Sequence, residues 1–257
     1  MKNILKIMLM MITIFTIAGS AVYAAEIPVS DQDQLITSSD WTEISNLQDE
    51  MKKEEPDATI DYDKALKVYV DCNLIKLQTA DTKKLTSALE SANYVWVIPF
   101  KMEKTYGMFT VAKGLPLREE AKSVLTKAEQ EEVKNHAGKW MITETAEHTV
   151  EPYYDILLEK REALSDCTRV VLVGSQPGMR QPVALGMDDE TARIWISLGY
   201  QYPVMKKIPE TQNVESGVYS FDSVAEISDT YIEDSEVSTG AGVQSRSSMK
   251  YVAGIGI

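Results

Sequence analysis

Residues 66–74 have the sequence LKVYVDCNL, in which side chains of two kinds alternate along the chain. Leu66, Val68 and Cys72 fall on one side of an extended backbone, whereas Lys67 and Tyr69 fall on the other. Successive side chains of a β-strand point to opposite faces of its sheet. This period of two therefore predicts a strand with one face on the core and one face in water.

Further strand-like segments follow, and two pairs of them are close enough in sequence to form hairpins. The predicted strands cover residues 94–98, 108–112, 140–142, 170–173, 182–187 and 191–198. The first two of these form one predicted hairpin and the last two form the other.

Helix signals separate these strands. Asp40 is expected to cap an amphipathic helix that stops before Pro56, and Asp81 to cap a second one. Thr126 and Glu129 have the spacing of a capping box, and Pro152 is placed to start a further helix.

This mixture of elements predicts an α+β fold, with a mainly antiparallel sheet and helices on one face. The order of elements also suggests a duplicated strand-helix-hairpin unit, with one copy over residues 66–113 and the other over 139–198. No residue identity between the two segments supports a duplication, so coincidence stays an equal alternative.

The amino terminus has the pattern of a secretory signal peptide. Lys2 and Lys6 precede an apolar run over residues 7–18, and small residues follow up to Ala24. The run is shorter than the roughly 20 residues of a spanning helix. We therefore predict cleavage after Ala24 or Ala25 and a mature chain that is secreted or associated with the cell envelope, without a stable membrane span.

Composition then divides the rest of the chain into three parts. Residues 25–60 are predicted to be a polar lead followed by a short amphipathic helix, and residues 61–207 the globular α+β domain. Residues 208–257 are rich in acidic residues, Ser and Gly, and are expected to be largely flexible.

The net charge of the whole chain is −13. Nucleic acids select basic patches, so a nucleic-acid partner is not expected. The acidic surface is better explained by solubility after export.

Cys72 and Cys167 are the only cysteines. In an exported chain, an even cysteine count suggests a disulfide. The alternative is two buried, unpaired thiols, because cysteine is among the most buried residue types. We expect both side chains to be buried and inert, and leave their pairing open.

No sequence motif indicates catalysis, a cofactor or a metal site. Ser175 lies in a Gly-Ser-Gln-Pro-Gly turn that has neither the lysine of a phosphate loop nor the spacing of a nucleophile elbow. His136 is expected in the last turn of a helix, where a cation complements the helix dipole. His148 is expected in a polar connection, where ordinary solvation accounts for it. Enzymatic activity is therefore uncertain, and we lean against it.

One stretch is denser in aromatic residues than the rest of the chain. Its members are Tyr94, Trp96, Phe100, Tyr106 and Phe109. A sheet face that displays such residues can bind glycans or peptides, whereas aromatic residues in strands more often belong to the core.

These observations predict a non-enzymatic binding or interaction module, with a peptide, a glycan or an envelope protein as partner. The alternative is a secreted hydrolase whose site is assembled from residues distant in sequence.

Overall fold

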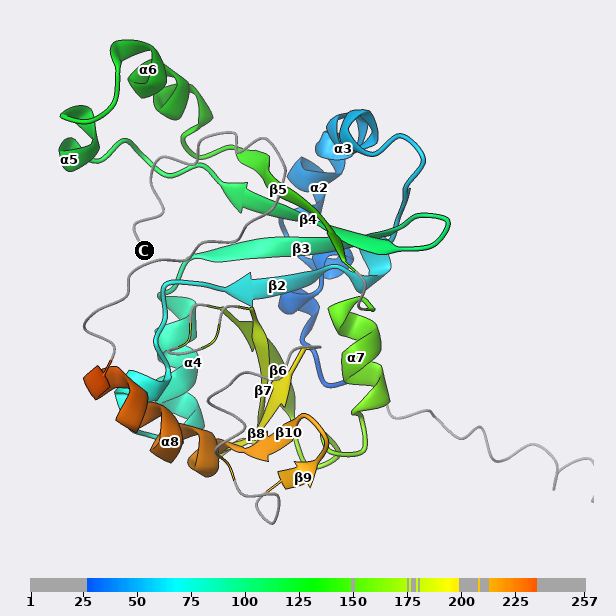
Figure 1. The fold of residues 1–257 in the computed structure, drawn as a ribbon, viewed down its shortest axis with the longest axis vertical. Coiled ribbons are helices and arrows are strands. Elements are labelled where there is room, and N and C mark those ends of the chain that lie inside the picture. The colour runs from blue at the N-terminus through cyan, green and yellow to red at the C-terminus, as the bar shows by residue number, and fades with distance from the viewer. Residues whose placement is uncertain are drawn as a thin grey trace, which may run out of the picture.

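The computed structural model describes residues 27–148, 151–174, 176, 179, 181–198, 208 and 213–234. Within them, one sheet has the strand order β5-β4-β3-β2-β6-β7-β8-β10-β9, and β1 pairs with β3 (Figure 1). The strands are β1 (Thr59–Ile60), β2 (Leu66–Tyr69), β3 (Tyr94–Lys101), β4 (Tyr106–Lys113), β5 (Trp140–His148), β6 (Arg169–Val173), β7 (Val183–Met187), β8 (Ala192–Ser197), β9 (Asn213–Glu215) and β10 (Val218–Ser220). The predicted signal peptide lies outside the described residues.

All strand pairs are antiparallel except β2 with β6, which are parallel. The predicted α+β class with a mainly antiparallel sheet is therefore confirmed. Both predicted hairpins are present, as β3–β4 and β7–β8. The strand that begins at Leu66 is shorter than predicted, because Asp71 takes a left-handed conformation with φ 59° just after it.

The sheet consists of two antiparallel meanders that meet at the parallel pair. One runs outward from β2 through β3 and β4 to β5, and the other from β6 through β7 and β8 to β10. A helix precedes each meander and packs on it, α3 (Gln48–Glu54) before β2 and α7 (Tyr153–Glu159) before β6. The expected order of elements is present in both segments, with a strand, a helix and a hairpin over residues 66–113 and a strand, a helix, a strand and a hairpin over 139–198. In the sheet, however, β5 pairs with β4 and completes the first meander.

Helices lie on both faces of this sheet, and two more, α5 and α6, lie away from it (Figure 1). They are α2 (Trp41–Ile44), α3 (Gln48–Glu54), α4 (Thr82–Glu90), α5 (Glu119–Lys122), α6 (Lys127–His136), α7 (Tyr153–Glu159) and α8 (Phe221–Asp234), with short 3-10 turns at Asp31–Asp33, Leu35–Thr37, Ser45–Leu47, Tyr62–Lys64 and Ile75–Leu77. We call the two sides the α4 face, covered by α2, α3, α4 and α8, and the α7 face, covered by α7 (Figure 1). The expectation of a single helical face therefore holds for four helices and not for α7.

Three apolar clusters fill these two faces. On the α4 face, one cluster joins α4 and α8 to β6–β8, and another joins α2 and α3 to β3–β5. The third cluster lies on the α7 face. Trp96 and Trp195 are the largest fully buried side chains and occupy the two clusters of the α4 face.

The described part of the carboxyl-terminal segment belongs to this fold. β10 pairs with β8, and the ring of Phe221 in α8 lies 6.1 Å from that of Trp195. Val218 and Val224 are also buried. Residues of β10 and α8 thus pack on the same sheet as the segment 61–207, because their apolar side chains cover the core around Trp195.

The predicted polar lead is likewise part of the fold from residue 27 onward. Val29 forms a bridge with Val170 in β6, and Gln34 forms one with Leu66 in β2. Residues 27–35, which we call the N-terminal strap, therefore lie between the starts of the two central strands. Ile27 in this strap is only 3% exposed.

Residues 115–139 form an arm that connects β4 to β5. It carries α5 and α6, and it projects away from the sheet (Figure 1). The predicted capping box at its second helix is present, since the Thr126 hydroxyl accepts from the Glu129 N–H and the Glu129 carboxylate accepts from the Thr126 N–H. The Gln130 amide donates to the carbonyls of Lys122 and Leu125 at 3.0 and 2.9 Å, which closes the turn between the two helices.

Candidate functional site: a buried charge cluster and an exposed arm

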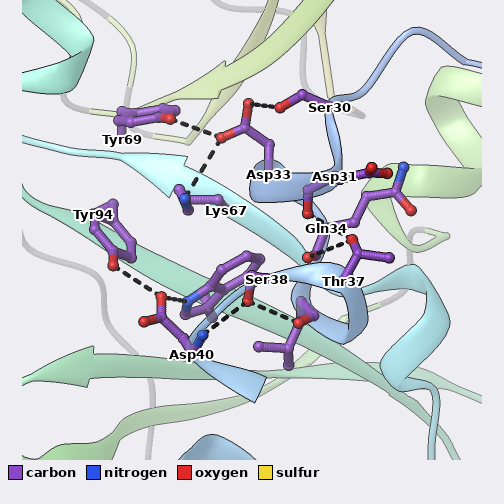
Figure 2. Close-up of polar contacts among 12 residues, drawn as sticks. Ser30, Asp31, Asp33, Gln34, Thr37, Ser38, Asp40, Lys67, Tyr69 and Tyr94 are labelled. Carbon is purple, nitrogen blue, oxygen red and sulfur yellow. Dashed lines mark hydrogen bonds and ion pairs between the residues drawn. The ribbon is translucent and has the colours of Figure 1, made fainter. Parts of the chain in front are cut away.

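Charged groups converge where the N-terminal strap passes between β2 and β6 (Figure 2). Asp33 is 2% exposed, and its carboxylate accepts from the Ser30 hydroxyl at 2.6 Å and from the Tyr69 hydroxyl at 2.7 Å. The Arg169 guanidinium donates to the same carboxylate at 3.1 Å, and Lys67 Nζ lies 3.8 Å from it. We call these five residues the Asp33 cluster.

Aromatic rings surround the lysine of this cluster. Lys67 Nζ lies 4.6 Å from the ring centre of Tyr94 and 5.2 Å from that of Trp96. The rings attract the cation electrostatically. Burial nevertheless lowers the pKa of Lys67, and the nearby Asp33 carboxylate opposes that shift. Lys67 and Tyr69 were expected to face water, but Tyr69 is buried and the Lys67 side chain is only 11% exposed, because the strap and the helices of the α4 face cover this side of β2.

A second carboxylate holds the neighbouring rings. Asp40 accepts from the Tyr94 hydroxyl at 2.8 Å and from Trp96 Nε1 at 3.0 Å (Figure 2). The expected helix cap at Asp40 is wrong, since its side chain makes no bond to the start of α2. Burial, and then the bond to Asp40, raise the pKa of Tyr94. Both carboxylates thus fix aromatic and cationic side chains of the central strands.

The arrangement of the Asp33 cluster favours a structural role over a catalytic one. Its carboxylate is enclosed and takes hydrogen bonds or an ion pair from four side chains. A general base or nucleophile needs a reacting group within hydrogen-bond reach. The cluster instead joins three segments that are far apart in the sequence: the strap, β2 and β6.

Sequence reasoning missed this cluster because its anion lies in the polar lead. One signal was available, since Lys67 stands between the apolar residues Leu66 and Val68 of a predicted strand. A charge in such a place is rarely buried without a partner. The partner, however, lies 34 positions away in the strap and could not be identified from spacing.

The predicted aromatic face is not an exposed surface. Trp96, Phe100 and Phe109 are buried in the core cluster under α2 and α3, whereas Tyr94 and Tyr106 are half-buried. Of the two alternatives for these five residues, the core therefore applies to Trp96, Phe100 and Phe109, because a helical layer covers this side of β3 and β4.

Both cysteines are buried, and both thiols are free. Cys72 belongs to the cluster under α4, whereas Cys167 belongs to the cluster on the opposite, α7 face. Burial first, and then nearby carboxylates, raise the pKa of each thiol to about 11. The disulfide that was left open is thus absent from this structure, and the expected burial is confirmed.

The remaining candidate residues do not converge. His136 ends α6 in the arm, and His148 is the last residue of β5 instead of part of a connection. Ser175 lies outside the described residues, but its neighbour Gln176 is buried and bonds the Leu74 N–H and the Cys72 carbonyl. This loop side chain therefore has a structural role.

The described residues contain neither a candidate metal site nor a candidate membrane span. In this part of the chain, no group of three or more histidine, cysteine, aspartate and glutamate side chains is arranged to hold a metal ion. No described helix combines the length and the apolar character needed to cross a membrane.

The arm is exposed to solvent, in contrast to the enclosed Asp33 cluster. None of residues 115–139 is buried, and Val124, between its two helices, is 81% exposed. Leu125 and Val133 are only half-buried. The arm thus presents apolar side chains to the outside from a turn that its own hydrogen bonds hold in place.

Comparison of the chain with known protein families, characterised proteins and solved structures finds no match. What this protein does therefore has to be inferred from its own side chains and surfaces.

Proposed function

We propose that the mature chain is an exported or envelope-associated module without enzymatic activity, which binds another protein through the arm. The observation that carries this proposal is the exposure of the arm: twenty-five consecutive residues, 115–139, include no buried side chain. Outside the arm, the exposed large apolar side chains of the described chain, Ile36, Leu77 and Leu158, are 37–43% exposed, about half the value of Val124. An ordered projection with exposed apolar side chains is typical of a contact surface.

The charge of the arm narrows the kind of partner. Residues 115–139 contain five acidic and five basic side chains, whereas the whole chain carries a net charge of −13. A balanced surface with apolar side chains at its tip suits neither nucleic acid nor an anionic lipid surface, which both select basic patches. A protein surface is the partner that best fits this combination.

The hydrolase alternative has less support. It requires a nucleophile and a base that lie within hydrogen-bond reach. Cys72 and Cys167 are enclosed in separate core clusters, and His136 lies on the arm. A glycan partner is also less well supported, because it required an exposed aromatic sheet face and three of the five aromatic residues are buried in the core.

Position-specific photo-crosslinking in the producing cells tests the proposal. A photoreactive amino acid replaces Val124 in one variant and Leu158 in the control, because Leu158 is an exposed apolar residue on α7, away from the arm. We expect a discrete protein adduct at position 124 that is absent at position 158. Equal labelling at both positions, or none at 124, would contradict a contact role of the arm.

Export is tested separately by sequencing the amino terminus of protein from the envelope and the culture fluid. The mature chain is expected to begin at Ala25 or Glu26. Recovery of only the intact Met1 form from the cytosol would contradict the export part of the proposal.

A further inference from the structure

We infer that the outer edge of β5 receives an extended, lysine- or arginine-containing segment of the protein partner as an additional strand. This inference rests on the proposed function, because it specifies the partner of the same end of the molecule. The arm leads directly into Trp140 at the start of β5, so the arm and this edge adjoin.

The first observation is the length of the edge. β5 has nine residues, pairs with β4, and is the outermost strand at its end of the described sheet. In an antiparallel pair, backbone groups of alternate residues point away from the neighbouring strand. The opposite end of the sheet is formed by β9, which has only three residues. β5 is therefore the longer template for pairing with another chain.

The second observation is that β5 carries few of the features that protect edge strands. Such strands are usually short or contain lysine, proline or bulges. Residues 140–148 contain neither lysine nor proline. One irregularity is present, opposite the Thr110–Val111 step, where the Thr143 hydroxyl donates to the Thr110 carbonyl at 3.1 Å. Residues 144–148, beyond this bulge, continue in register with β4.

The third observation is the charge beside this regular part of the edge. Thr145 pairs with Phe109, which belongs to the core under α3, so Thr145 and Glu147 lie on the α4 face of β5. The Thr145 hydroxyl donates to Glu54 at the end of α3, and Glu55 follows directly, so this bond brings the three glutamates to one side of the edge. Burial, and then the charges of Glu147 and Glu54, raise the pKa of Glu55. Among the described residues, no lysine, arginine or histidine forms an ion pair with them.

These observations together define the occupant. An added strand places alternate side chains on the same face as Glu147, so a lysine or arginine there meets three carboxylates that no cation of the described residues neutralises. A second copy of this chain is disfavoured, since pairing two β5 edges would bring Glu144 and Glu147 of both copies together. Like charges opposite each other destabilise a strand pair.

The probe for this site is a synthetic nine-residue peptide, as long as β5, in which lysine alternates with valine. Its binding to the full mature chain is measured by fluorescence anisotropy, together with amide hydrogen exchange of residues 140–148. Two further peptides carry N-methyl groups on the backbone at odd or at even positions. A fourth peptide has glutamate in place of each lysine.

We expect the lysine peptide to bind and to slow amide exchange in β5. One N-methylated peptide should bind at least about tenfold more weakly because it cannot form the backbone bonds, while the other binds nearly as well. Glu147→Lys should weaken binding by about tenfold, whereas Glu90→Lys, the same charge change on the exposed end of α4, should have little effect. The glutamate peptide should not bind.

Equal binding of both N-methylated peptides, or equal affinity for the Glu147→Lys and Glu90→Lys proteins, would overturn the inference. These results are independent of the crosslink at Val124. Peptide binding without that crosslink would refute the contact role of the arm alone. The crosslink without peptide binding would refute strand addition alone.

Discussion

Replacing Asp33 by asparagine is expected to destabilise the protein more than any other single charge change in the described chain. The substitution keeps the size of the side chain and its ability to bond Ser30 and Tyr69, but it removes the negative charge. The side chains of Arg169 and Lys67 are only 19% and 11% exposed, so both cations would stay in a largely dry site without their anion.

The magnitude follows from this burial. Removing one partner of a buried ion pair costs about 3–5 kcal/mol, because an uncompensated charge is left in the interior. With an m-value of about 2–3 kcal/mol per M, a loss of about 4 kcal/mol lowers the urea midpoint by about 1.5 M. A surface control and a triple variant separate the effect of the lost charge from the effect of changed packing.

The assay is urea unfolding at neutral pH, followed by tryptophan fluorescence and circular dichroism. Glu131→Gln is the matched control, because Glu131 pairs with Lys134 on the surface of α6, where the two side chains are 66% and 52% exposed. Its midpoint should stay that of the parent protein, since exposed pairs contribute little.

A second variant tests the cause. Adding Lys67→Met and Arg169→Met to Asp33→Asn removes the two unpaired cations and should recover much of the lost stability, because an apolar replacement of a buried ion cluster is often neutral. A midpoint of Asp33→Asn within error of the parent would refute the role of this cluster. A triple variant less stable than the single one would refute the explanation by unpaired charge.

Three further perturbations test the core. Cys72 and Cys167 should react slowly with thiol reagents at about pH 8 and faster as the pH approaches 11, because burial raises their folded-state pKa to about 11. The stability that the two thiols contribute is present below their unfolded-state pKa and is lost as the pH rises through about 11. Fast labelling of the native protein at about pH 8 would contradict their burial. Gly107→Ala should destabilise by about 1–3 kcal/mol, since an added Cβ would lie 2.1 Å from the buried ring of Phe100, and unchanged thermal unfolding would contradict this contact. A chain that ends before β9 should aggregate or unfold because Trp195 loses its cover, and recovery of a stable, soluble fragment would show that β10 and α8 are dispensable.

Much of the fold was determined by local patterns that the sequence displays. The alternation from Leu66, the two hairpins and the caps at Asp81 and Thr126 follow from periodicity and short-range hydrogen bonding, which need no knowledge of distant residues. The α+β class follows from the mixture of these elements. The burial of Cys72 was likewise predicted from its place in an apolar phase.

Only the tertiary structure decided which polar residues are buried and which apolar ones are exposed. Asp33 lies in a segment of polar composition, yet it is enclosed because Arg169 and Lys67 reach it from two different strands. Trp96 is an aromatic residue of the kind that forms binding faces, but it lies under a helical layer. Val124 is an apolar residue of the kind that fills cores, but it lies at the tip of the arm. Composition and periodicity describe neighbours along the chain, whereas burial depends on which distant segment packs above each face of the sheet.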